Sequence, residues 1–155
     1  MAKVDPIPAA YPRVSPYLTV DGAAQAIDFY CDVLGATQRG ERMVAPDGKV
    51  GHAELAIGDS VVMLADAWPE MGATTPADLG GSPVTLHVYV DDVDRVFAKA
   101  LAAGAIEIRP VTDQFYGDRS GLFADPWGHL WDVASHVEDV PADEMMRRAA
   151  EVMGG

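Results

Sequence analysis

At 155 residues the chain has the usual length of one domain with its own core, and its single cysteine, Cys31, excludes an internal disulfide. Its 11 basic and 24 acidic side chains give a formal net charge of −13, which repels a phosphate backbone and excludes nucleic acid as a partner. No apolar run reaches the ~20 residues that cross a bilayer, and the first residues lack the apolar core of a signal peptide, so we expect a cytoplasmic protein without membrane contacts.

A strand and helix pattern occurs twice, offset by about 70 residues, as from Tyr17 to His87. Residues 17–36 (YLTVDGAAQAIDFYCDVLGA) and 87–105 (HVYVDDVDRVFAKALAAGA) each predict a strand, an acidic helix start, a helix and a Gly-Ala stop. Each helix has one apolar face, formed by Ala26, Ile27, Tyr30, Val33 and Leu34 in the first and by Val93, Val96, Phe97, Ala100 and Leu101 in the second. The chain is therefore predicted to contain two related modules.

The ends of both helices carry residues that favour capping. Asp21 and Asp91 stand just before the helices, where a carboxylate accepts hydrogen bonds from free backbone amides. Gly35 and Gly104 follow the last periodic residues, and glycine readily adopts the left-handed conformation that ends a helix. We expect the aspartates as N-caps and the glycines as terminators.

Three short strand candidates follow each helix. In the first module they are RMVA, VGHAELAI and SVVMLA, with turns at 46–48 and 58–59. In the second they are IEIRPV, RSGLFA and HLWDVAS, with an Asp-Pro-Trp-Gly turn at 125–128 before the last strand. Each module is thus predicted as β-α-β-β-β. The predicted organisation is one domain, 1–155, with a first module at 13–66, a connector at 67–83, a second module at 84–136 and a helical tail at 137–155.

Three segments lie outside the repeated pattern. The first dozen residues, with three prolines, predict an extended arm. The connector, rich in Gly, Pro and Thr, is either a lid or binding loop or simply a crossover between modules. The tail has Pro141 near a helix start, and we expect this helix to dock on its own domain or on a symmetry mate. Its apolar side consists of Met145, Ala149, Val152 and Met153.

The duplicated module, AIDFYCDVLGA at 26–36 and ADPWGHLWDV at 124–133 together resemble the vicinal oxygen chelate superfamily of glyoxalase I, bleomycin-resistance proteins, fosfomycin-resistance transferases and extradiol dioxygenases. HAELAIGDSVVMLAD, the Gly-Gly-Ser-Pro before VTLHVYVDDVD, and DQFYGDRSG further resemble its PhnB-type, glyoxalase-like branch. The resemblance spans about residues 13–136. It implies an α+β fold in which tandem modules form a curved mixed sheet with a cleft. Because this fold hosts many chemistries, it does not fix the activity.

The resemblance also implies metal-ligand positions on the first and last strands of each module. By their neighbouring motifs these positions are Ser15, Met63, Thr85 and Asp132, where glyoxalase-like enzymes place His, Glu or Gln. Only Asp132 is a credible ligand for a divalent metal, whereas such a centre needs three or four good ligands. We therefore expect the usual metal site to be absent and no cofactor to be bound, a divalent metal at an off-pattern site being the alternative.

Strand alternation assigns residues to faces, because successive side chains point to opposite sides of a sheet. The first strands each have a polar side, formed by Ser15, Tyr17 and Thr19 in one module and by Thr85, His87 and Tyr89 in the other. We expect this side to line the cleft. On strand 51–57, His52 and Glu54 share the polar side. They are candidate catalytic residues, as a general base and its orienting carboxylate, or else form a harmless hydrogen-bonded pair or solvated edge.

The last strand separates Asp132 from Trp131, since neighbouring residues cannot face the same side. The resemblance places Asp132 in the cleft, so we expect Trp131 to be a core residue. His129 follows the turn and is expected to stabilise it or to have a local partner. His136 ends the strand, where it can hydrogen-bond the tail.

Four residues in loops and turns are candidate ligand contacts. Arg119 is either a clamp for a carboxylate or oxyanion, or the partner of a nearby carboxylate. Trp68, Phe115 and Tyr116 either stack on a planar ligand or pack at a dimer interface.

Three functions compete. The first is a bleomycin-resistance-like protein that binds a small organic molecule without the usual metal. The acidity of the chain favours a cationic ligand. Its ligand-binding candidates are Tyr17, Met63, Trp68, His87, Tyr89, Tyr116, Arg119 and Asp132. The second is a glyoxalase-like lyase or isomerase that uses His52, Glu54 and His87 with Asp132, with an off-pattern metal or none. The third is a structural or regulatory protein with a vestigial cleft. In each case we expect a homodimer.

Overall fold

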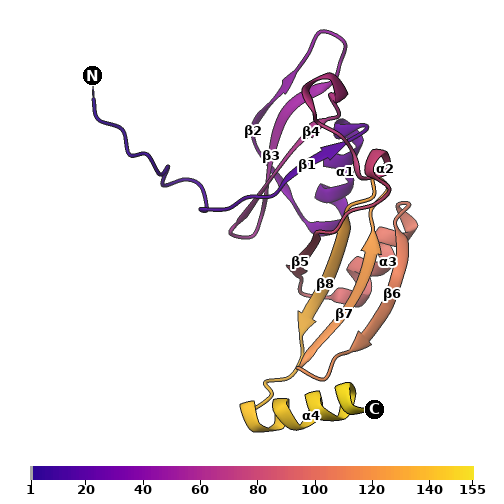
Figure 1. Ribbon diagram of the computed structural model, residues 1–155. Helices are drawn as coiled ribbons and strands as arrows, with labels where there is room; N and C mark the ends of the chain where they lie inside the picture. Colours follow the sequence, from indigo (N-terminus) through magenta and orange to yellow (C-terminus); the bar gives the residue numbers. More distant parts are fainter. Residues whose placement is uncertain (1) are drawn as a thin grey trace. The chain divides into compact units, whose positions relative to one another are not determined.

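The computed structural model describes residues 2–155 and divides the chain into two compact units, one ending at Leu79 and one beginning at Gly80. This boundary lies inside the predicted connector. Each unit contains one of the predicted modules (Figure 1). None of the helices in residues 2–155 is both long and apolar enough to cross a membrane.

The first unit holds the expected β-α-β-β-β module, formed by β1 (Tyr17–Val20), α1 (Ala23–Leu34), β2 (Thr37–Val44), β3 (Val50–Ile57) and β4 (Ser60–Asp66). Its mixed sheet has the order β1-β4-β3-β2, with β1 parallel to β4. β2 begins earlier than the predicted RMVA, because Gln38 and Arg39 already pair with β3. The connector contains the 3-10 helix η1 (Pro69–Met71) and the short helix α2 (Pro76–Leu79).

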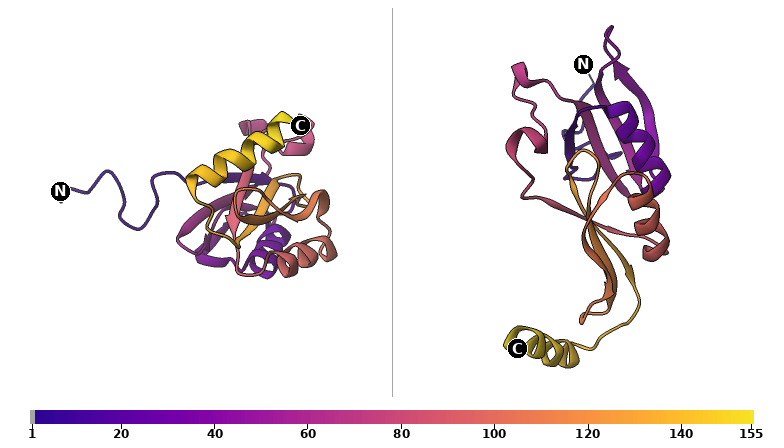
Figure 2. Two further views of the ribbon diagram at one scale, coloured as in Figure 1. Left: turned by 90° about the horizontal axis from the view of Figure 1, so that it is seen from below. Right: turned by 90° about the vertical axis from the view of Figure 1, so that its right-hand side faces the viewer.

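The second unit repeats this topology with β5 (Thr85–Tyr89), α3 (Val93–Ala102), β6 (Ile106–Asp113), β7 (Asp118–Ala124) and β8 (Leu130–His136). Its sheet has the order β5-β8-β7-β6, and β5 runs parallel to β8. The tail forms α4 (Ala142–Gly154), which follows β8 at the end of the chain (Figure 2). The fold is therefore α+β, with one four-stranded mixed sheet in each unit.

One face of each sheet is covered by the helix of its own module. All five predicted apolar residues of α1 are buried, and so are Val93, Val96, Phe97 and Ala100 of α3, whereas Leu101 is only half-buried. Trp131 lies in the second core, 2% exposed, as expected, and its Nε1 donates to Asp125. Gly121 of β7 lies so close to α3 that an added Cβ would be 2.8 Å from Phe97 Cε2. The remaining faces carry the polar side chains.

The predicted N-caps are wrong in both modules. Gly22 occupies the cap position of α1, and Asp66 at the end of β4 accepts hydrogen bonds from the amides of Gly22 (2.8 Å) and Ala23 (2.9 Å). Asp92, not Asp91, caps α3, and Ser135 of β8 accepts from the amide of Val93. The last strand of each module thus supplies an acceptor to its own helix, which local sequence cannot reveal.

The left-handed terminators are confirmed. Gly35 ends α1 with φ of 67° and donates its amide to Tyr30. Gly104 has φ of 103° and follows Ala103, the C-cap of α3. A side chain would be strained at either position.

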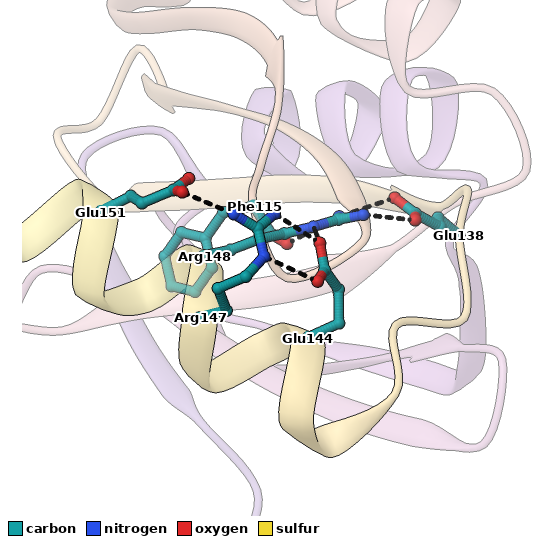
Figure 3. A network of polar contacts seen from close by, with 6 residues as sticks. All are labelled: Phe115, Glu138, Glu144, Arg147, Arg148 and Glu151. Atoms are coloured by element: carbon teal, nitrogen blue, oxygen red, sulfur yellow. Dashed lines mark hydrogen bonds and ion pairs between the residues drawn. The ribbon is translucent and has the colours of Figure 1, made fainter.

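The tail contacts the second unit through charged side chains, and its apolar side is only partly covered. No residue of α4 is buried, and Val152 and Met153 are largely exposed. Arg148 instead donates to the carbonyl of Phe115 (3.2 Å) and forms a forked ion pair with Glu138 (Figure 3). Met145 and Ala149 of the apolar side are half-buried, and charged side chains make the hydrogen bonds of the tail to the rest of its unit.

Candidate functional site

The polar face of the first sheet carries a row of four side chains, one from each strand. Strand register places Tyr17 of β1 beside Met63 of β4, Met63 beside Glu54 of β3, and Glu54 beside Arg39 of β2. Two predicted ligand-binding residues and one predicted catalytic residue therefore meet. His52, two residues before Glu54, lies on the same face.

Hydrogen bonds fix most of this row. The Tyr17 hydroxyl lies 2.7 Å from His52 Nδ1, and His52 Nε2 is 3.9 Å from Glu54 Oε2, beyond hydrogen-bond range. The predicted His52 and Glu54 pair is close but not bonded. Tyr11 of the N-terminal arm donates its hydroxyl to Glu54 Oε1 at 2.6 Å. This hydrogen bond raises the pKa of Tyr11, and burial raises the pKa of Tyr17.

Two buried polar atoms of this row make no hydrogen bond within the chain. Within residues 2–155, Glu54 Oε2 and Arg39 Nη1 are the side-chain atoms with this property. Arg39 also donates through Nη2 to the carbonyl of Ala10 at 2.8 Å, and its Cζ lies 4.6 Å from the centre of the Tyr11 ring. A buried acceptor or donor without a partner costs about 1–3 kcal/mol. The first polar face is therefore a hydrogen-bonding surface with unused capacity.

The second polar face has an equivalent row with a different charge arrangement. His87 of β5 lies beside Asp132 of β8, Asp132 beside Leu122 of β7, and Leu122 beside Arg109 of β6. His87 Nδ1 and Arg109 Nη2 each lie 3.0 Å from one oxygen of Asp132. The Asp132 carboxylate is thus held from both sides within its own sheet.

This second row continues toward the tail through shared carboxylates. The Tyr89 ring packs edge-on against His87 at 4.8 Å, and its hydroxyl donates to Asp118 at 2.8 Å. Asp118 also contacts His136 Nδ1, and His136 Nε2 contacts Asp139. Burial by itself would raise the pKa of Asp118, but its bonds to His136 and Tyr89 outweigh this effect and lower it. The contacts to Asp139 and Asp118 raise the pKa of His136.

Three further predicted residues, Arg119, Trp68 and Tyr116, make other contacts. Arg119 lies on the α3 side of its sheet, where it pairs with Asp94 and Asp113 at 2.8 and 3.1 Å, the contacts of the ion-pair alternative. The ring of Trp68 lies 5.4 Å from Lys49 Nζ. Tyr116 packs edge-on against Phe115.

The two remaining histidines lie at the two ends of β8. The backbone amide of His129 donates to Asp125 within the turn, and His136 bonds Asp139 of the tail.

Sequence reasoning missed Tyr11, Arg39 and Arg109. The two arginines are separated by the same offset of about 70 residues that separates Tyr17 from His87, so the internal repeat contained a signal for them. Tyr11 stands in an arm without periodicity, and nothing in its neighbourhood indicates its contact with Glu54.

The donor set does not fit the metal that the superfamily's fold implies. Asp132 is already engaged by a guanidinium and an imidazole, and Met63 offers only a thioether. Register places Thr85 beside Leu130 and His87 beside Asp132, so Thr85, another mapped position, is two residues out of register with the carboxylate. Among the described residues, no three His, Cys, Asp or Glu side chains form a group suited to a metal ion.

Comparison with known proteins identifies the family. A sequence profile of the Glyoxalase/Bleomycin resistance protein/Dioxygenase superfamily matches residues 12–133. The chain belongs to this superfamily. The uncharacterized protein Mb0911c of Mycobacterium bovis is 47% identical over 137 residues, which cover 86% of this chain and 90% of that protein.

Solved structures agree with this assignment. TioX from Micromonospora sp. ML1 has a TM-score of 0.61 and 28% identity, covering 84% of this chain and all (100%) of that one. The PhnB protein from Bacillus cereus has a TM-score of 0.62 and 19% identity, covering 80% of this chain and 99% of that one, and supports the fold. The predicted glyoxalase-like, PhnB-type fold is confirmed.

Proposed function

We propose that this superfamily member binds a small organic molecule on the polar faces of its sheets, without the usual metal centre. The observation that carries the proposal is the pair of buried, unpartnered atoms, Arg39 Nη1 and Glu54 Oε2, on adjacent strands of one face. A ligand that bonds these atoms removes their desolvation cost. The formal charge of −13 favours neutral or cationic ligands over anions. We further propose a cytoplasmic homodimer.

A ligand screen tests this proposal. Thermal-shift screening of planar aromatic and cationic compounds, followed by calorimetry, should identify ligands whose binding weakens about tenfold or more in Arg39→Met or Asp132→Asn. Glu41→Gln, an exposed position of β2, is the matched control and should bind like the wild type. A folded protein that binds no member of the library would contradict the proposal and favour a vestigial site.

Elemental analysis tests the metal-free part separately. Protein purified without chelators or metal-affinity columns should contain no stoichiometric transition metal. Near-stoichiometric Zn, Ni, Mn or Fe that disappears in Asp132→Ala would contradict it.

A glyoxalase-like lyase or isomerase is the second candidate. It is favoured by the alignment of the Tyr17 hydroxyl, His52 and Glu54, in which a small movement would join His52 Nε2 to Glu54 as a general base. Turnover of a 2-oxoaldehyde adduct that is lost in His52→Ala would support it. Wild-type rates in His52→Ala and Glu54→Gln would exclude this acid–base role.

A further inference from the structure

The N-terminal arm reaches the first polar face at one point. Every residue from 2 to 14 is exposed, and Figure 1 shows this stretch as an extended segment before β1. Its contacts with the sheet centre on Tyr11, whose hydroxyl donates to Glu54, and on Ala10, whose carbonyl accepts from Arg39. The other hydrogen bonds of the arm are local, such as that from the Tyr11 amide to the Pro8 carbonyl.

These contacts are of the kind that recognise a ligand. A flat ring lies against a guanidinium, 4.6 Å from Arg39 Cζ to the ring centre, and the ring's polar end bonds a carboxylate. A guanidinium is planar and stacks well on aromatic faces, and an ionised carboxylate only accepts hydrogen bonds. The face therefore selects a planar ring that carries a donor.

Tyr11 satisfies this face incompletely. The same two side chains that hold Tyr11 each retain one buried atom without a partner, Oε2 in Glu54 and Nη1 in Arg39. An open surface pocket of about 300 Å³ lies beside the contact, lined by residues 9–12 of the arm, Arg39, Ala56 and residues 58–61. The arm covers this part of the sheet without filling it, so a better-matched molecule can replace it.

We propose that Tyr11 occupies the ligand's place, and that the ligand of the first sheet is a planar aromatic molecule with a hydroxyl or amine donor that displaces the arm. This inference rests on the proposed small-molecule function. The ring stacks on Arg39, and the donor bonds Glu54. Because the arm is covalently attached, it competes with the ligand at a high effective concentration. The apparent affinity for the ligand falls in proportion to the fraction of chains whose arm is released.

The test uses p-cresol, which is the tyrosine side chain as a free molecule, titrated into full-length protein and followed by NMR at the amides of Arg39 and Glu54. Tyr11→Ala should bind p-cresol about three- to tenfold more tightly than the wild type, the equivalent of one net hydrogen bond. In the wild type, p-cresol should also release the arm, seen as increased fast motion of the Ile7 and Tyr11 amides. Val4→Ala, an exposed arm position without sheet contacts, should leave the affinity unchanged.

Two further probes separate the ring from the donor. 4-Methylanisole keeps the ring without a donor, and 4-methylcyclohexanol keeps the donor without a flat ring; each should bind Tyr11→Ala at least about fivefold more weakly than p-cresol. Equal p-cresol affinities in wild type and Tyr11→Ala, or no shifts at Arg39 and Glu54 in either, would overturn the inference. In that case, compounds from the library screen that bind at another place would still support the proposed small-molecule function. If no compound of the library binds, both the inference and the proposed function are contradicted.

Discussion

The equivalent rows of the two sheets carry their acidic side chain on different strands. In the first sheet the carboxylate is Glu54 on β3, and in the second it is Asp132 on β8. The arginines stand on equivalent edge strands, Arg39 on β2 and Arg109 on β6. Arg39 is therefore one strand away from Glu54, and Arg109 is two strands away from Asp132. Asp132 finds its partners within its own sheet, whereas one oxygen of Glu54 is bonded by the arm and the other accepts no hydrogen bond. A shift of one strand thus separates an acid held within its own sheet from one held by the N-terminal arm.

The largest expected contrast concerns the turns before the last strands. Asp125, 2% exposed, accepts from the amides of Trp127 and His129 and from Trp131 Nε1. Asp125→Ala leaves these donors unpaired and should lower the free energy of unfolding by about 3 kcal/mol or more. Asp59→Ala, in the exposed turn of the first module, should change it by less than about 0.5 kcal/mol. Equal urea midpoints for the two variants would contradict this contrast.

Asp66 and Ser135, which accept hydrogen bonds from the first amides of α1 and α3, should differ in how their contribution to stability depends on pH. Burial would raise the pKa of Asp66, but amides of Val50, Ala23 and Gly22 outweigh it and lower the pKa below the ordinary 3.8. A lowered folded pKa means that this stabilisation is present above pH 3.8 and is lost as the pH falls through the folded value.

Asp66→Asn places an amide group against the Val50 N–H and should cost about 2 kcal/mol at pH 7. It should also flatten the acid limb of the stability curve, measured by urea unfolding from pH 7 to pH 3. Ser135→Ala, its uncharged counterpart in the second module, should cost about 1 kcal/mol with an unchanged acid limb. If Asp66→Asn loses stability at low pH as the wild type does, groups other than Asp66 cause that loss.

A third contrast concerns how closely each helix approaches its sheet. In Gly121→Ala, the new Cβ would lie 2.8 Å from both Phe97 and Val111, so the variant should lose about 1–3 kcal/mol by overpacking. The equivalent residue of the first module is Ala53, which already carries a methyl group at 1% exposure. Ala53→Gly should lose about 1 kcal/mol, since glycine weakens a strand interior. Thermal unfolding measures both, and a stabilised Gly121→Ala would refute the close contact.

The smallest expected effect is a pH response of the tail. The pKa of His136 is raised by Asp139 and Asp118, so its stabilisation is complete below the ordinary pKa of 6.5 and is lost as the pH rises through the raised value. The surrounding groups are Tyr89, bonded to Asp118, and the Arg148 and Glu138 pair. The α4 amides should therefore become more mobile between pH 6 and pH 9 in NMR relaxation. His136→Ala should remove this change, and the same change in the variant would exclude His136 as its cause.

Periodicity predicted most of the fold because burial imposes it. The apolar spacing of residues such as Ile27 and Phe97 identified both helix faces, and strand alternation placed Tyr17 and His87 on the polar side. The caps were missed because Asp66 and Ser135 reach the helices from strands distant in sequence. Local patterns cannot report such contacts.

The candidate site was predicted only in part for the same reason. Alternation brought His52 and Glu54 to one face, but it could not show that Tyr11 would bond the carboxylate. It also could not decide between the two roles of Arg119, which depends on Asp94 of α3. Residue type indicated which side chains can act, and three-dimensional contacts decided which of them are already engaged.

The way α4 is attached has a consequence for solution conditions. The helix buries no residue, and Arg148 joins it to its unit through an ion pair with Glu138 and a bond to the Phe115 carbonyl. Exposed charge pairs are screened by salt, with a Debye length of about 8 Å at physiological ionic strength and about 3 Å at 1 M, whereas apolar cores are not. Rising ionic strength should therefore loosen α4 before it loosens either sheet, because each sheet is also held by an apolar core that salt does not screen.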